Sequence, residues 1–508
     1  MFDKICGYEL DKQQLDIVFD NSKYMLVVAG AGSGKTLTIL GKVYYLLKYK
    51  NIKPEEILCI SFTKNAADNL KNKIFNDLGY DVPTYTFHKL SLLILGNDNY
   101  TIADNNLLFD IICRFFSFDI LNSSLLMKLV LKYFDIKTYG NTKDIYLNFY
   151  NNNFSLFDIL IKTIIAFISL FKCNNYSLKD FILFSKKIKF TFNYKKYKLN
   201  KQLLTLIVNI YIIYEEYLKN NNEIDFNDML ILASDKVKNC KLVFDYKYII
   251  IDEYQDTSFV KFNLIKNIID RSSSKLMVVG DDFQSIYRFT GCDLSLFVDF
   301  GNYFPSACIK KIETTYRNSK ELVFVAGNFV MKNKLQLKKN LTSFKTLNKP
   351  IKIYRYRNVK DEFEKLIKLV TLSFNNIMII GRNNNDVYYY LNDNFVYKNG
   401  EITYKNNGYL NIYYLTAHKS KGLEEDCVII INLYDNILGF PSKINNPDIL
   451  DLVSIKKEKF LYAEERRLFY VALTRTKNNV YLFCPNKNKS SFIEELICDY
   501  KKYSEFIN

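Results

Sequence analysis

A glycine-rich stretch near the start of the chain decides the fold: Ala29-Gly30-Ala31-Gly32-Ser33-Gly34-Lys35-Thr36. An apolar run of buried-strand type at 25–28 precedes it, and apolar residues at helical spacing follow it. A strand, a tight loop and a helix in this order surround a phosphate with backbone N–H groups and a helix N-terminus. Lys35 can then reach the terminal phosphates, and the Thr36 hydroxyl can bind magnesium. We therefore predict a nucleotide-binding loop at 29–36, in which Ala29 takes the place of the usual first glycine.

Similar apolar runs recur along the chain, and several lead into helical patterns, which indicates an α/β protein with parallel sheets. These runs lie at 57–60, 248–251, 276–279, 377–380, 411–415, 428–433 and 480–484. This number of strands is enough to form two sheets. Between about 91 and 224 the apolar positions follow helical spacing instead, which predicts an all-helical insertion.

Composition sets wider bounds. The chain has 508 residues, of which 49% are hydrophobic, enough for several domains with apolar cores. A formal net charge of +16 favours a polyanionic partner such as nucleic acid, although an AT-rich genome would also enrich lysine. The ten cysteines form no CxxC pair and there are only two histidines, so no zinc or iron–sulfur ligand set is recognisable.

We expect a soluble, intracellular protein without a membrane span. The first residues carry no basic-then-apolar export signal. The most apolar segment, 154–171, is interrupted by Asp158 and Lys162 and is interpreted as a buried helix. Cytoplasm, nucleus and a viral replication site are not distinguished by these features.

The most basic stretch, 186–201, interleaves lysines with Phe190, Phe192, Tyr194 and Tyr197. Rings that stack on bases and lysines that meet phosphates would make it a strand-binding surface. Alternatively, it is a solvated lysine face with its aromatic rings packed inward.

A second group of chemistry-bearing residues follows the apolar run at 248–251, beginning with Asp252 and Glu253. Carboxylates at the carboxyl end of a strand lie where ligands bind in such sheets. Asp252 can therefore hold magnesium while Glu253 orients and deprotonates water, as in an ATPase. Cations are then needed for the charge of the transition state, and Arg317 and Arg475 are the candidates.

With these residues in place, the chain resembles the UvrD/Rep type of superfamily 1 DNA helicases, which are P-loop ATPases. The resemblance covers nearly the whole length, and the family's motifs occur in the family's order. Besides the two sites above, the matching segments are 10–14, 57–67, 86–88, 225–230, 280–289, 416–424 and 464–475.

The resemblance implies roles for residues that single patterns do not. Gln14 would read the adenine, Tyr316 would stack on it and Glu424 would touch the ribose. Gln284 would sense the terminal phosphate, which Arg317 and Arg475 would reach from the second core domain. A DNA track would be formed by Phe62, Thr63, Phe87, His88, Tyr287, Phe289, Thr416 and His418.

The resemblance also implies two RecA-like domains. We expect residues 1–90 and 225–280 to form the first, 91–224 to be its helical accessory insertion, and 281–508 to form the second. The family's second accessory subdomain is expected to be absent or reduced to a loop near 383–410. Three residues depart from the family pattern: Leu37 and Thr290 stand where arginines are common, and Phe283 replaces an aspartate.

We therefore predict an ATP- and Mg²⁺-dependent DNA helicase for repair or replication, which moves 3'-to-5' on single-stranded DNA and opens duplex junctions. The polarity follows from the resemblance alone. The alternatives are a single-strand translocase that does not unwind and a nucleotide-gated binding protein with little turnover. RNA remains open as a substrate because stacking and phosphate contacts do not exclude a 2'-hydroxyl. The oligomeric state cannot be read from the sequence.

Overall fold

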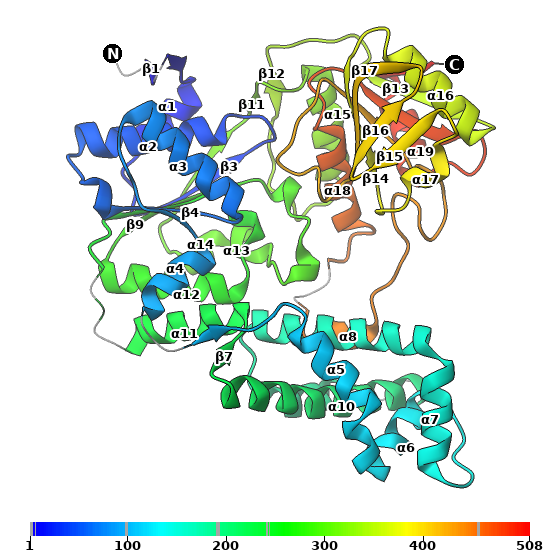
Figure 1. Cartoon of the computed structure of the whole chain (residues 1–508). Coiled ribbons are helices and arrows are strands. Elements are labelled where there is room, and N and C mark those ends of the chain that lie inside the picture. Colours follow the sequence, from blue (N-terminus) through cyan, green and yellow to red (C-terminus); the bar gives the residue numbers. More distant parts are fainter. Residues whose placement is uncertain are drawn as a thin grey trace.

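The computed structural model describes residues 4–5, 7–96, 100–188, 194–239, 242, 244–454 and 458–507. Two α/β domains lie side by side, and a layer of long helices lies beneath them in the view of Figure 1. The prediction of parallel α/β sheets with a helical insertion in the first domain is confirmed.

The first sheet has six strands in the order β10-β3-β9-β8-β4-β5, and every pairing is parallel. Parallel strands covered on both faces are apolar throughout, and the central strands of this sheet are buried accordingly. The strands are β3 (Tyr24–Ala29), β4 (Ile57–Ser61), β5 (Thr84–Thr86), β8 (Tyr248–Ile251), β9 (Lys275–Gly280) and β10 (Cys308–Ile312).

Helices cover both faces of this sheet because side chains alternate along each strand. Met25 and Val27 face one apolar cluster, shared with α1 to α3, while Leu26 and Val28 face the other, shared with α4, α11 and α12. The helices are α1 (Lys12–Phe19), α2 (Lys35–Tyr49), α3 (Lys64–Leu78), α4 (Phe87–Leu95), α11 (Phe226–Asn239), α12 (Phe259–Ser272), α13 (Ser295–Val298) and α14 (Phe300–Tyr303).

The helical insertion begins after α4 and rests on one continuous apolar cluster. A short pairing of β6 (Thr101–Ile102) with β7 (Glu223–Ile224) closes its base. By length and composition α8 could cross a membrane, but it packs into this cluster and half of its most apolar window is buried. The helices are α5 (Leu107–Ser117), α6 (Ser124–Tyr133), α7 (Thr142–Asn152), α8 (Phe154–Cys173), α9 (Asp180–Lys187) and α10 (Tyr194–Asn220).

The described part of the basic stretch favours the inward-packed alternative. Lys195 and Lys196 form ion pairs with Asp135 and Asp448, and Tyr197 packs against the insertion's core. Phe190 and Phe192 lie outside the described residues.

The second sheet has eight strands in the order β15-β16-β17-β14-β18-β19-β13-β20. Helices α15, α18 and α19 cover one face and α16 and α17 the other. Its strands are β13 (Ile351–Tyr356), β14 (Asn376–Gly381), β15 (Phe395–Lys398), β16 (Glu401–Tyr404), β17 (Asn407–Thr416), β18 (Cys427–Ile430), β19 (Val480–Pro485) and β20 (Ser504–Ile507). Its helices are α15 (Lys320–Met331), α16 (Val359–Val370), α17 (Val387–Tyr390), α18 (Ala463–Leu473) and α19 (Ser491–Asp499).

Two predicted boundaries need correction. The first domain does not end at 280, because β10 pairs with β3 along its whole length. Nor is 383–410 a loop: β15 and β16 form an antiparallel hairpin that extends the second sheet. Asn399 and Gly400 join them with φ of 52° and 93°, as a two-residue Asn-Gly hairpin turn requires.

A segment of the second domain also reaches the insertion. After β18 the chain descends to α8 and α10, where the short helix η6 (Asp448–Leu452) packs, and then returns to α18 (Figure 1). Ile449, Leu450 and Val453 are buried in the insertion's core cluster. The insertion is therefore in contact with both α/β domains.

Candidate functional site

The site forms at the carboxyl edge of the first sheet, where parallel strands bring distant segments together. The loop at 30–34 joins β3 to α2, and Asp252 and Glu253 directly follow β8. Lys35 Nζ lies 3.1 Å from Glu253 Oε1, so the glycine-rich loop and the acidic pair meet as the sequence predicts.

Gly32 and Gly34 are required in the loop by their backbone conformation and by close neighbours. Gly32 and Gly34 have φ of 68° and 78°, a region that side chains rarely adopt. A Cβ on Gly32 would lie 2.5 Å from Arg317 Cβ, and a Cβ on Gly34 would lie 2.7 Å from Gln14 Nε2. The loop is therefore enclosed by residues from two other segments.

Gln14, predicted to read the adenine, is fully buried beside this loop. It forms a reciprocal cap with Asp11 at the start of α1, and its Nε2 donates to the Ser33 carbonyl over 3.2 Å. The Tyr316 hydroxyl donates to Asp11 over 2.9 Å, while its ring is 51% exposed. Gln14 and Tyr316 thus border the same loop, and the Tyr316 ring remains open to a ligand.

Burial and neighbouring charges shift the pKa values of the two carboxyl groups in the acidic pair in opposite directions. Burial and the charge of Glu253 raise the pKa of Asp252 to about 6. Burial also opposes ionisation of Glu253, but the charges of Lys35 and Lys421 outweigh it and lower its pKa to about 2. At neutral pH Glu253 is therefore ionised, as a proton-accepting group must be.

The same carboxylates act on the lysine. Burial lowers the pKa of Lys35, but the charges of Glu253, Asp252 and Asp281 outweigh this effect and raise it. Lys35 is consequently a permanent cation at the mouth of the loop.

The donor set fits a magnesium ion. Mg²⁺ prefers oxygen ligands and usually takes only one or two carboxylates, with substrate phosphates and water completing its shell. Asp252 supplies one carboxylate, and Thr36 places a hydroxyl in the first turn of α2, next to the lysine that touches Glu253. The Ser33 hydroxyl in the same loop is buried and has no hydrogen-bond partner among the described residues.

The predicted arginines face this site from the second domain. Arg475 is 1% exposed, and its Nη2 donates to Gln284 Oε1 over 3.4 Å. Burial and the neighbouring charge of Arg317 lower the pKa of Arg475 to about 9. Arg317 pairs with Glu424 over 2.6 Å, so Glu424 also lies at this interface.

Sequence reasoning missed several residues of this interface. Lys421 pairs with Asp256 over 2.5 Å and donates to the Gln284 carbonyl, which joins the two α/β domains. Its place within the segment 416–424 was a signal that could have found it. The Tyr470 hydroxyl accepts from the Ala31 N–H over 3.4 Å, and no local pattern marks this contact.

Aromatic residues extend the site along the seam between the domains. Phe289, which is 59% exposed, lies 5.6 Å from His418 and 6.1 Å from Tyr287 between ring centroids. The Tyr287 hydroxyl donates to the His418 carbonyl. These three predicted DNA contacts, from both α/β domains, are therefore neighbours.

A second aromatic group lies at the ends of β4 and β5. Phe62 is half-buried beneath Lys261, whose Nζ is 4.5 Å from the ring centroid, and Thr63 is exposed at the start of α3. His88 packs edge-on against the exposed ring of Phe226. Lys261 was not predicted, because its helix α12 is distant in sequence.

Two of the predicted DNA contacts are buried in this structure. Phe87 is 1% exposed and packs in the core, where it meets the edge of Phe62 instead of presenting a face to solvent. Thr416 is 7% exposed, and its hydroxyl accepts from the Lys419 N–H within the following turn. Neither side chain is available to a strand in this conformation.

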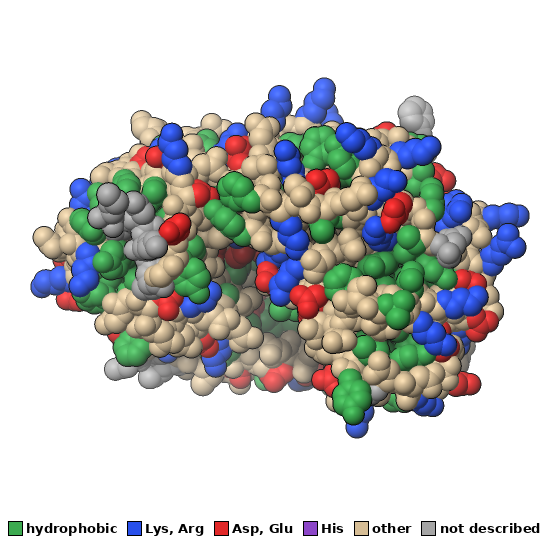
Figure 2. Space-filling model, turned by 90° about the horizontal axis from the view of Figure 1, so that it is seen from above, with side chains coloured by type: hydrophobic (Ala, Val, Ile, Leu, Met, Phe, Trp, Pro, Cys, Tyr) green, Lys and Arg blue, Asp and Glu red, His purple; other side chains and the backbone are tan. Residues whose placement is uncertain are grey.

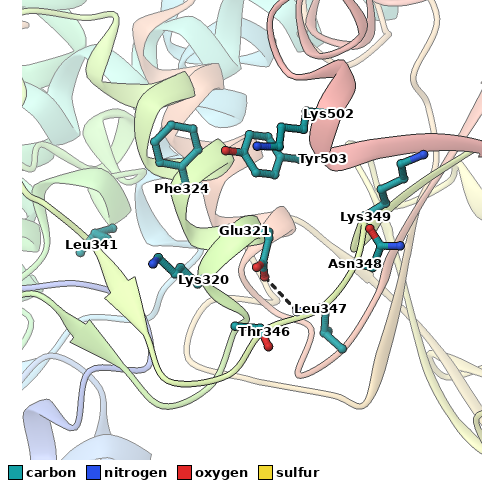
Figure 3. A pocket seen from close by; sticks show the side chains of 10 residues that line it. All are labelled: Lys320, Glu321, Phe324, Leu341, Thr346, Leu347, Asn348, Lys349, Lys502 and Tyr503. Carbon is teal, nitrogen blue, oxygen red and sulfur yellow. Dashed lines mark hydrogen bonds between the residues drawn. The ribbon is translucent and has the colours of Figure 1, made fainter.

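The rest of the surface indicates a ligand site less clearly than the nucleotide site does. The face in Figure 2 has Lys and Arg side chains scattered among other types, with a recess between the two lobes. A cavity of about 700 Å³ opens beside α15, lined by Phe324, Tyr503 and several lysines (Figure 3). Glu321 at its wall accepts from the Leu347 N–H, so that carboxylate is already occupied.

Comparisons with known proteins identify the family of the chain. The family described as the UvrD/REP helicase N-terminal domain matches residues 10–305, and the UvrD-like helicase C-terminal domain matches 391–487. The chain therefore belongs to the UvrD/Rep helicase family.

Individual relatives are moderately similar. The chain is 28% identical to DNA helicase IV of Escherichia coli (strain K12), over 97% of this chain and 71% of that protein. It is 26% identical to the ATP-dependent DNA helicase Rep of Buchnera aphidicola subsp. Baizongia pistaciae, over 84% of this chain and 55% of Rep. It is 28% identical to the ATP-dependent DNA helicase PcrA of Bacillus subtilis (strain 168), over 68% of this chain and 42% of PcrA. The chain thus spans about half the length of these Rep and PcrA relatives.

Proposed function

We propose that this protein is an ATP-dependent DNA helicase that moves 3'-to-5' along single-stranded DNA and unwinds duplexes during repair or replication. The observation that carries the proposal is the continuity between two sites. Gln284 meets Arg475 at the nucleotide site, and three residues later Tyr287 meets His418 in the exposed aromatic group. A change at one site can therefore be transmitted to the other through a short segment.

The charges support ATP hydrolysis. Lys35 would exchange Glu253 for the terminal phosphate, while Arg317 and Arg475 would approach the same phosphate from the second domain. Asp252 and Thr36 would hold Mg²⁺, which supplies Lewis-acid polarisation of the phosphates. Glu253, ionised at neutral pH, would accept a proton from the attacking water.

Strand movement follows from closure and reopening of the interface. ATP held by residues of both domains favours the closed arrangement, and hydrolysis removes that preference. Phe289 and His418 belong to different domains, so their separation would change with each cycle. Bases stacked on such rings would be released and recaptured in turn.

Substitutions in the nucleotide site test the enzyme assignment. Lys35→Ala and Glu253→Gln should each abolish ATP hydrolysis stimulated by single-stranded DNA. Glu401→Gln, at an exposed position of strand β16, is a matched control that should retain it. Turnover retained in both site variants would refute the assignment.

The direction of movement needs its own test. Two duplexes are compared, one with a 3' and one with a 5' single-stranded tail. Only the 3'-tailed duplex should be unwound. A preference for the 5' tail would overturn the polarity, whereas ATP turnover without strand displacement would favour a translocase. The hairpin at 395–404, which stands where the family has an accessory subdomain, is the observation that keeps this second candidate in view.

A further inference from the structure

A buried lysine lies behind the Gln284 segment and comes from the other domain. After α15 the chain returns to the first domain, where Leu337 packs against its core and Leu341 lies against Gly30. Between them Lys339 is 1% exposed. No charged residue so deeply buried is left unpaired without a large cost, so its partners define its role.

Those partners are the two carboxylates that precede Gln284. Lys339 Nζ forms ion pairs with Asp281 Oδ1 and, over 2.6 Å, with Asp282 Oδ1, and both carboxylates are fully buried. Burial raises the pKa of Asp282, and the charge of Lys339 opposes this effect.

Asp281 passes this restraint to the Gln284 side chain. Its second oxygen, Oδ2, accepts from Gln284 Nε2 over 2.7 Å, which leaves Gln284 Oε1 directed at Arg475. The Asp281 N–H donates to Gln255, whose Nε2 lies 2.5 Å from Glu253. Lys339 is thus one residue removed from the group expected to sense the terminal phosphate.

The same lysine explains why Phe283 is tolerated in place of the family's aspartate. Its ammonium lies 3.5 Å from the Phe283 ring centroid, and the ring meets the edge of Tyr470 over 5.3 Å. A third carboxylate is therefore replaced by a cation–π contact within an apolar cluster.

We propose that Lys339 is a positioning residue for ATP hydrolysis, which fixes the Gln284 side chain through Asp281 while it ties the second domain to the first. This proposal rests on the proposed function, because it needs Gln284 to act on the nucleotide. In this proposal Lys339 acts on the nucleotide through Asp281 and Gln284 and not by direct contact.

A double-mutant cycle on ATP hydrolysis tests the proposal. Lys339→Met, Gln284→Ala and the double variant are compared with the unaltered chain at saturating single-stranded DNA. Lys339→Met should lower kcat at least about tenfold and change KM for ATP less than about threefold, because the loss affects an interaction of the transition state. In the Gln284→Ala background it should have no further effect on kcat.

Two companion variants separate positioning from folding. Lys172→Met removes another buried lysine that pairs with several carboxylates, remote from the nucleotide, and should leave the basal kcat unchanged. The second variant combines Lys339→Met with Asp282→Asn. It removes one positive and one negative charge, so the net charge of positions 339, 281 and 282 stays the same as in the unaltered chain. If Lys339→Met alone does not fold, this pair replaces it in the cycle with the same expectations.

The outcomes are distinct. A kcat loss that is absent in the Gln284→Ala background supports the proposal. An unchanged kcat in folded Lys339→Met, or losses that multiply in the double variant, would overturn it. Failure of the proposed function would instead show in the unaltered chain, as an absence of ATP hydrolysis stimulated by DNA.

Discussion

Lys172, at the root of the helical insertion, gives the sharpest stability prediction. It is the penultimate residue of α8, with a side chain that is 4% exposed. Its ammonium lies 2.7 Å from Asp225 Oδ2, 2.7 Å from Asp228 Oδ1 and 2.8 Å from Glu215 Oε1. Asp225 and Asp228 belong to the segment where the chain re-enters the first domain, so this cluster fixes the insertion to that domain.

Lys172→Met keeps the length of the side chain and leaves three acids without their cation. Breaking a buried ion pair costs about 3–5 kcal/mol, and we expect the lower end because Glu215 is partly solvated. About 3 kcal/mol corresponds to a roughly hundredfold larger equilibrium constant for opening of the helix. Amide hydrogens of α8 and α10 should therefore exchange about a hundredfold faster, as measured by mass spectrometry.

The stability defect of Lys172→Met should depend on pH, because Asp228 titrates in this cluster. Burial and the charge of Asp225 raise the pKa of Asp228 to about 6, against an ordinary value of 3.8. Ionisation of Asp228 therefore costs stability as the pH rises through 6, and loss of Lys172 increases that cost. The defect of the variant should thus diminish as the pH falls from 7 to 5.

Lys162→Met on the same helix is the matched control, because Lys162 is 71% exposed and pairs with Asp158 one turn away. Such a surface pair contributes about 0.3–0.5 kcal/mol, so exchange should hardly change. Equal exchange rates in the Lys172→Met and Lys162→Met variants would refute the reasoning.

Four further predictions concern ligand binding. Phe289→Ala should weaken the affinity for single-stranded DNA by about 1–3 kcal/mol, because a base can no longer stack on the Phe289 ring. Fluorescence anisotropy measures this affinity. Tyr409→Ala, which removes a 98% exposed residue on β17, should leave the affinity unchanged. Burial, together with the charges of Arg382 and Lys421, lowers the pKa of His418 to about 4, so DNA affinity should show no histidine titration between pH 5.5 and 7.5; a step near 6.5 would contradict this. Tyr316→Ala should raise KM for ATP about 2- to 10-fold with kcat retained, as expected for lost stacking; an unchanged KM would exclude the contact. Gly32→Ala should abolish nucleotide binding in calorimetry, because the added Cβ would meet Arg317. Gly79→Ala, at a residue with a similar φ but open space around it, should bind the nucleotide normally. Equal binding by the two variants would exclude the steric argument.

The nucleotide half of the site could be predicted because its signals are local. The loop at 29–36 and the pair Asp252 and Glu253 each follow a recognisable apolar strand, and parallel pairing brings such strand ends together. Lys339 and Lys261 could not be found in this way, since each acts on residues that are distant in sequence. For the same reason the descent of η6 to the insertion left no mark in the sequence.

Other features of the structure had signals that were present in the sequence. Phe87, Leu90, Ser91 and Ile94 are buried at helical spacing, a pattern that places Phe87 in the core. Asn399-Gly400 between alternating residues indicates the hairpin. Strand β10 was harder to find, because Lys310 and Lys311 interrupt its apolar pattern at the edge of the sheet.

The proposed function requires that ATP hydrolysis and strand binding are coupled through the segment from Gln284 to Phe289. The most direct measurement is the steady-state rate of ATP hydrolysis with and without single-stranded DNA, in the unaltered chain and in Phe289→Ala. We predict strong stimulation by DNA in the unaltered chain and, in the variant, stimulation that requires a higher DNA concentration. A rate that is the same with and without DNA would contradict this coupling.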